Sequence, residues 1–216
     1  MSTMTARRLD LPLTLFAVAA AVELVAVAAD VTALQWVAKP LLAPLLIAHL
    51  RRPGPITPAL VFATAGDIAL LIPGQTAFLI GMLFFLGTQI TLIVAFLRRS
   101  RPPVAAMIGY GVVWAGANVL LWSRLGALRV PVMIYSLALT AMAAAAAGVS
   151  RRVAAGGACF LVSDALIGLG VAGFEPPGHG VLVMATYMAA LYLIATGCDG
   201  RESAGVGHDM NRFTAA

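Results

Sequence analysis

The chain has 216 residues, of which 61% are hydrophobic and 11% are charged, and its mean hydropathy is +0.96. A soluble domain carries about 25% charged residues, so this composition excludes an ordinary water-soluble globular protein. The net charge of +5 comes almost wholly from arginines in short clusters, which indicates contact with anionic lipid headgroups rather than with nucleic acid.

Arginine, proline and glycine residues divide the chain into apolar stretches of the length that a spanning helix needs, about 20 residues. Backbone polar groups in lipid must be satisfied within the segment, so each stretch is expected to be helical. The sequence therefore predicts an all-α, polytopic membrane helix bundle with eight transmembrane helices. In chain order, the predicted spans cover residues 11–29, 33–50, 57–73, 76–97, 103–122, 131–149, 153–171 and 179–197.

Domain organisation and orientation follow from the polar residues between the spans. Residues 1–200 are predicted to form one transmembrane domain, and residues 201–216 a short, polar, disordered cytoplasmic tail. Eleven arginines precede the first span or follow the second, fourth, sixth and eighth spans, whereas Arg124 and Arg129 lie in the opposite loops. The positive-inside rule then predicts that both termini are cytoplasmic, and we expect the protein to lie in the inner (plasma) membrane of the cell.

Ionisable side chains inside the predicted spans are the strongest functional signal, because they are costly in lipid and usually face a polar interior. The spans contain Glu23, Lys39, Asp67 and Asp164, with His49 near the end of the second span. The two aspartates follow a small residue near the middle of the third and seventh spans. A parallel four-plus-four internal repeat would produce this pattern.

Two carboxyl groups in an apolar surrounding suit acid–base chemistry, because one can be held neutral as a proton donor beside another that acts as base. The alternative is that Asp67 and Asp164 are satisfied by neighbouring hydroxyl and amide groups or by Lys39. Lys39 could bind a phosphate, neutralise a carboxylate or extend to the interface. Glu23 is expected to pair with Lys39, and His49 to be interfacial.

Several other polar residues lie at helical depth, where they can hydrogen-bond between helices: Gln89, Asn118, Tyr135 and Tyr187. Cys159 and Cys198 are interpreted as structural. The sequence has no metal-ligand spacing and no nucleotide-binding motif, so we predict neither a cofactor nor a metal.

Six short motifs follow one another along the spans: Lys39-Pro40-Leu-Leu-Ala-Pro44-Leu, Gly66-Asp67-Ile-Ala-Leu, Phe78-Leu-Ile-Gly81-Met-Leu-Phe84-Phe85, Tyr135, Ser163-Asp164-Ala-Leu and Met184-Ala-Thr-Tyr187. Their order and spacing resemble the YhhN family of lysoplasmalogenase-like integral membrane proteins. The resemblance runs from the second predicted span to the eighth.

The resemblance implies a hydrolase that cleaves the vinyl ether bond of a lysoplasmalogen to a fatty aldehyde and a glycerophospho-headgroup product. The implied partners are a lysophospholipid substrate and the lipid bilayer. Asp67 and Asp164 would face one cavity as the catalytic pair, with acid and base unassigned. The remaining site residues would be Lys39, Gln89, Tyr135 and Tyr187 around the substrate, with Glu23 and Ser163 in support.

The fourth span departs from the family pattern. Many members carry a His and a Tyr near the position of Thr88-Gln89-Ile90-Thr91, so a His-based proton relay is not expected here. Two other classes of function remain open. A small proton-coupled transporter could use the intramembrane aspartates but would need alternating access, and a non-catalytic scaffold or sensor would use them only for packing.

Overall fold

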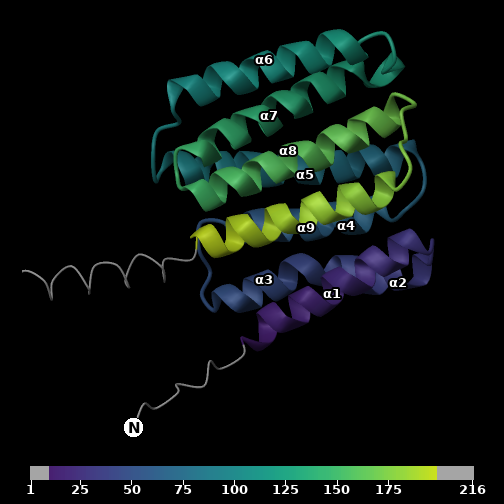
Figure 1. The fold of residues 1–216 in the computed structure, drawn as a ribbon, viewed down its shortest axis with the longest axis vertical. Helices are drawn as coiled ribbons and strands as arrows, with labels where there is room; N and C mark the ends of the chain where they lie inside the picture. The colour runs from purple at the N-terminus through teal and green to yellow at the C-terminus, as the bar shows by residue number, and fades with distance from the viewer. Residues whose placement is uncertain (1–9, 199–216) are drawn as a thin grey trace, which may run out of the picture.

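The computed structural model describes residues 10–198, and every regular element within them is helical (Figure 1). The elements are α1 (Leu11–Ala28), α2 (Thr32–Ala38), the 3₁₀ turn η1 (Lys39–Leu41), α3 (Leu42–Leu50), α4 (Thr57–Leu70), α5 (Gln75–Leu97), α6 (Val104–Leu121), the 3₁₀ turn η2 (Gly126–Leu128), α7 (Arg129–Ala147), α8 (Arg151–Val171) and α9 (His179–Cys198). The predicted tail over 201–216 lies outside the described residues, as do Arg7, Arg8, Arg201 and Arg212.

Among the described residues, seven helical stretches are long and apolar enough to cross a membrane. One of them is the stretch Thr32–Leu50, which combines α2, η1 and α3. The remaining apolar helix, α4, has 14 residues and ends at Leu70 rather than at the predicted residue 73. Pro73 disfavours helical backbone at the residue before it, so the apolar Leu71 and Ile72 lie in a turn instead. The all-α, polytopic membrane class is confirmed.

The second predicted span is interrupted where Lys39 lies. Pro40 has no backbone N–H to donate to the preceding turn, and the chain tightens there into the single 3₁₀ turn η1 before continuing as α3. Lys39 is therefore placed at a break between two helical segments, and its side chain is half-buried.

The helices run side by side (Figure 1), and their packing is reciprocal between the two halves of the chain. The third and fourth long elements of each half pack together, α4 with α5 and α8 with α9. In addition, α5 packs against α7, and α9 packs against α3. If the two halves are parallel repeats of four helices, equivalent helices should make equivalent contacts, as these pairs do.

The two ends of the bundle differ in charge. The loops 51–56, 98–103 and 148–150 form an arginine-rich end (left in Figure 1), and the loops 29–31, 71–74, 122–128 and 172–178 form the opposite end. Between the ends, the outward-facing side chains are largely apolar; Leu83, Val119 and Leu120 are examples. An apolar belt of this kind is solvated by lipid tails.

Candidate active site

The two intramembrane aspartates each accept a hydrogen bond from a tyrosine on another helix. The hydroxyl of Tyr187 on α9 donates to Oδ2 of Asp67 on α4 at 2.7 Å. The hydroxyl of Tyr135 on α7 donates to Oδ2 of Asp164 on α8. Asp67 also interacts electrostatically with Asp164, so the two carboxyl–tyrosine pairs belong to one polar region inside the bundle.

Asp164 has a second donor on the same oxygen. The side-chain amide of Gln89 on α5, itself fully buried, donates to Asp164 Oδ2 at 3.4 Å. Oδ1 of Asp164 accepts no hydrogen bond from any residue in the range 10–198. The carboxyl group is therefore held through one oxygen, while the other remains available to a bound molecule.

Tight packing of aromatic rings holds Tyr187 in place. The rings of Phe85, Phe160 and Tyr187 meet edge to face, with centroids 5.8 to 6.2 Å apart, a geometry that aromatic pairs favour. Gly66, next to Asp67, lets α5 approach this closely, because a Cβ there would lie 2.8 Å from the Phe85 ring. The local sequence around Asp67 is thus explained by packing.

A cavity of about 300 Å³ lies between α5, α6, α7 and α8, within the half of the bundle away from the arginine-rich end. Its wall is largely apolar and includes Phe78, Met82, Leu121, Val132 and Ile167, and Asp164 and Tyr135 contribute the ionisable groups. The volume is at the lower end of what small-molecule sites offer, roughly 300 to 1,000 Å³. An alkyl chain in this cavity would lie against the Asp164 carboxyl group.

Asp67 and Asp164 were predicted to face one cavity, but of the two only Asp164 lies in this wall. Asp67, at 1% exposure, and its partner Tyr187 are buried and do not line the cavity. Gln89 is also buried and does not line the cavity, but its side-chain amide donates to Asp164. Ser163 donates to the backbone carbonyl of Val183 at 3.0 Å, which ties α8 to α9 directly beside Asp164.

Lys39 interacts electrostatically with both Glu23 and Asp67, but neither carboxyl group lies within ion-pair distance of it in the described chain, so the expected Glu23–Lys39 ion pair is not formed. Glu23 is fully buried, and neither of its oxygens has a hydrogen-bond partner among residues 10–198. Nδ1 of His49 lies 2.8 Å from Oδ2 of Asp10 near the arginine-rich end.

Some polar cavity residues were not predicted as site residues, although the interhelical hydrogen bond expected of Asn118 is confirmed. Asn118 on α6 donates to the hydroxyl of Ser136 on α7 at 3.1 Å and to the carbonyl of Trp114 at 2.8 Å, and Thr140 lies one turn beyond Ser136. Ser136 and Thr140 are four residues apart and therefore lie on one face of α7, which was the signal that could have revealed this polar side of the cavity. Within the described residues, no three His, Cys, Asp or Glu side chains gather as metal ligands.

Membrane-length helices around two tyrosine-bonded carboxyl groups and an apolar cavity define a multi-pass α-helical membrane protein with a polar site inside its bundle. The chain belongs to the YhhN family, whose model matches residues 34–198. The resemblance found in the sequence is therefore confirmed.

Two curated relatives are each named lysoplasmalogenase, one from Mycobacterium bovis and one from Mycobacterium tuberculosis. Each is 36% identical to this chain over 155 residues, which are 66% of this chain and 59% of the relative. The chain thus matches less than two thirds of the length of these relatives. No solved structure matches the chain.

Proposed function

We propose that this protein is a membrane-embedded hydrolase that cleaves the vinyl ether bond of a lysoplasmalogen, or of a related ether lysolipid, to a fatty aldehyde and a glycerophospho-headgroup product. The observation that carries the proposal is the Asp164 carboxyl group, which has one oxygen bonded and one oxygen available in the wall of an apolar cavity. The lysoplasmalogenase name of the two relatives supports this choice of substrate.

The chemistry starts with a proton transfer, because a vinyl ether is hydrolysed through protonation of its alkene. Asp164 gives its proton to the alkene carbon farther from the ether oxygen, and an oxocarbenium ion forms while Asp164 becomes a carboxylate. Tyr135 and Gln89, which donate to its other oxygen, stabilise that carboxylate as it forms.

Water then completes the reaction. It adds to the carbon that bears the ether oxygen and gives a proton to the Asp164 carboxylate, which regenerates the acid. The hemiacetal collapses: its hydroxyl proton moves to the glycerol oxygen, the carbon–oxygen bond breaks, and the aldehyde leaves with the alcohol. A single carboxyl group can thus act first as acid and then as base, as glycosidases with related oxocarbenium chemistry do.

Asp67 has a different role in this proposal, since it is sealed from the cavity. Its charge interacts electrostatically with the Asp164 site and stabilises the nearby cation, and Tyr187 holds it in position. Lys39 balances the charge of Asp67 and Glu23. Ser163 fixes the helix that carries Asp164. No cofactor enters this sequence of steps.

The lipid enters with its alkyl chain in the cavity between α5, α6, α7 and α8. We further propose that the arginine-rich end faces the cytoplasm of the cell's inner membrane, which places both termini there. The cavity then lies in the outer half of the bilayer, and the substrate headgroup remains near the end of the bundle opposite the arginines.

The test is aldehyde release by the purified protein in detergent, with two lysolipids that differ in one bond. A lysoplasmalogen has an alkene to protonate, whereas the saturated alkyl ether analogue has none. We expect turnover of the first lipid and none of the second. Equal turnover of both, or release of fatty acid from an acyl lysolipid alone, would contradict vinyl ether hydrolysis.

One observation favours a second candidate, a proton-coupled transporter. Each half of the bundle carries a tyrosine-bonded carboxyl group, and transporters with internal repeats bind substrates and coupling ions at the interface between the repeats. A transporter would move a solute across proteoliposomes in response to a pH gradient and would release no aldehyde in detergent, where no gradient exists.

A further inference from the structure

A second hollow lies at the arginine-rich end, far along the bundle from the Asp164 cavity. It has a volume of about 560 Å³ and is lined by the segment 50–56 between α3 and α4, together with Arg99 and Cys198 at the ends of α5 and α9. Both Leu70 and Val171, which line the first cavity, lie at the other end of their helices. The two hollows are therefore separate sites.

Three arginines, Arg51, Arg52 and Arg99, line this hollow, and among residues 10–198 its wall contains no acidic residue. Among residues 10–198, none of the three has a carboxylate within ion-pair distance. Asp10, the acidic residue described at this end, is bonded to His49. Like charges gathered without a counter-charge repel one another, so the arrangement favours an anionic occupant.

The backbone that carries two of these arginines is held by local bonds. Arg51 closes α3 in the left-handed conformation, with φ of 58°, and the N–H of Arg52 donates to the carbonyl of Leu50 at 2.7 Å. The N–H of Gly54 donates to the hydroxyl of Thr57 at 2.8 Å, and Gly54 lies between two prolines that restrict the chain. The two guanidinium groups thus extend from a loop of defined shape.

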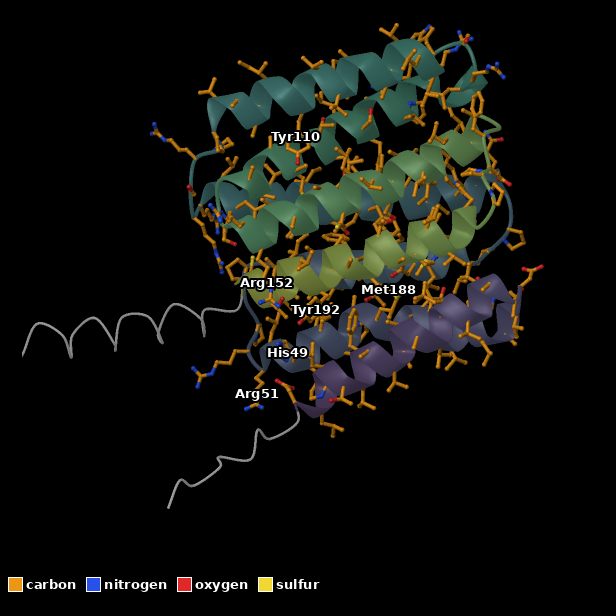
Figure 2. All side chains as sticks on the ribbon, in the orientation of Figure 1. His49, Arg51, Tyr110, Arg152, Met188 and Tyr192 are labelled. Atoms are coloured by element: carbon orange, nitrogen blue, oxygen red, sulfur yellow. The ribbon has the colours of Figure 1, made fainter. Side chains whose placement is uncertain are left out.

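Arg99 approaches from the other side. Its Nη2 donates to the carbonyl of Cys198 at 3.0 Å, which anchors the side chain, and the other N–H groups of the guanidinium have no partner among residues 10–198. A planar guanidinium matches the oxygens of a phosphate with paired hydrogen bonds. Figure 2 shows Arg51 and Arg152 at this same end of the bundle.

We propose that this hollow binds the phosphate group of an anionic membrane phospholipid. The position supports a lipid as the source, because the wall is formed by the ends of three spanning stretches and includes the apolar Leu50 and Ile56 beside the arginines. Basic pockets between membrane helices recognise lipid headgroups in this way. The site is independent of the proposed hydrolysis, because it needs neither aspartate.

The experiment measures lipid retention by native mass spectrometry of the purified protein, titrated with phosphatidylglycerol or phosphatidylcholine. We expect a several-fold preference for phosphatidylglycerol in the wild type. Arg52→Gln should weaken phosphatidylglycerol binding about tenfold, since it removes a charge-assisted hydrogen bond. Arg99→Gln is the second variant and should act in the same direction.

The matched control is Arg151→Gln, which removes the same charge at the same end but lies outside the hollow. It should leave the affinity unchanged within twofold. Equal weakening in Arg52→Gln and Arg151→Gln, or no preference in the wild type, would overturn the site in favour of general attraction to a basic surface. Full displacement of the lipid by inorganic phosphate would also overturn it, because the site would then serve a soluble anion.

Discussion

The two halves of the bundle carry the same carboxyl arrangement in different surroundings. The polar positions correspond along the chain: 39 with 135, 67 with 164 and 89 with 187 are separated by nearly the same length of sequence. Each aspartate receives a hydrogen bond from the fourth long helix of the other half, Asp67 from Tyr187 and Asp164 from Gln89. Yet Asp164 lines a cavity, whereas Asp67 is sealed.

The difference comes from the first helix of each half. In the first half, α1 packs against α2, α3 and α9 and buries Phe16, Ala19, Glu23 and Ala26. In the second half, α6 packs chiefly against α7 and buries none of its residues. Because α6 is loosely attached, the space beside Asp164 stays open. The Asp164 carboxyl group can therefore contact a ligand, whereas the similar Asp67 carboxyl group is buried inside the bundle.

Replacing the two aspartates in turn tests this division of roles, and it carries the largest expected effect. Asp164→Asn removes the proposed acid and should lower turnover about 10³-fold, within the range of general acid catalysis. Asp67→Asn acts at a distance and should lower it by roughly 10-fold to 100-fold. Aldehyde release from lysoplasmalogen measures both, and a greater loss in Asp67→Asn would reverse the assignment.

The two tyrosines should separate activity from stability. Tyr135→Phe removes a donor to the reacting carboxyl group and should lower turnover about 10-fold to 100-fold with little change in the melting temperature. Tyr187→Phe leaves the buried Asp67 without its hydroxyl donor and should cost about 1–3 kcal/mol of stability, with a smaller loss of turnover. Aldehyde release and thermal unfolding are measured for both variants. Equal losses of turnover and of stability in the two variants would contradict the proposed difference between Tyr135 and Tyr187.

Filling the cavity should weaken substrate binding. Gly168 lines the cavity, and a Cβ at this position would meet nothing within 4 Å, so Gly168→Leu extends into the space proposed for the alkyl chain. We expect KM to rise about tenfold, which is the size of effect that a small change in an apolar pocket has on substrate selection.

Gly109→Leu is the matched control for this substitution. Gly109 on α6 also has open space around it and does not line the cavity, so KM should not change. Similar rises in KM for Gly109→Leu and Gly168→Leu would show that helix flexibility, rather than cavity space, sets KM.

The smallest effect concerns the packing of the sealed half. Gly66→Ala introduces a Cβ only 2.8 Å from the Phe85 ring and should cost about 1–3 kcal/mol through overpacking. Gly116→Ala on α6, where a Cβ meets open space, should be neutral or slightly stabilising. Thermal unfolding in detergent compares them, and equal stability would mean that the Asp67 region repacks freely.

Much of the site was visible in the sequence, because polar residues are costly in lipid and therefore stand out. Asp67, Asp164, Tyr135, Tyr187 and Gln89 were all predicted as site residues, and the structure brings each into one of two hydrogen-bonded groups. Their catalytic and binding roles stay predictions. The sequence did not indicate which tyrosine bonds to which aspartate, because that pairing joins residues more than a hundred positions apart in the case of Asp67 and Tyr187.

The sequence by itself determined the class of protein, the succession of apolar helices and the presence of carboxyl groups among them, since hydropathy and the cost of charge in lipid act on each segment separately. The tertiary structure alone decided that Asp164 faces a cavity, that Asp67 is sealed and that three arginines from two loops border one hollow. These features depend on how closely each helix packs on its neighbours. That closeness is set by contacts between residues on different helices, such as Gly66 with Phe85. A local sequence pattern does not predict such contacts.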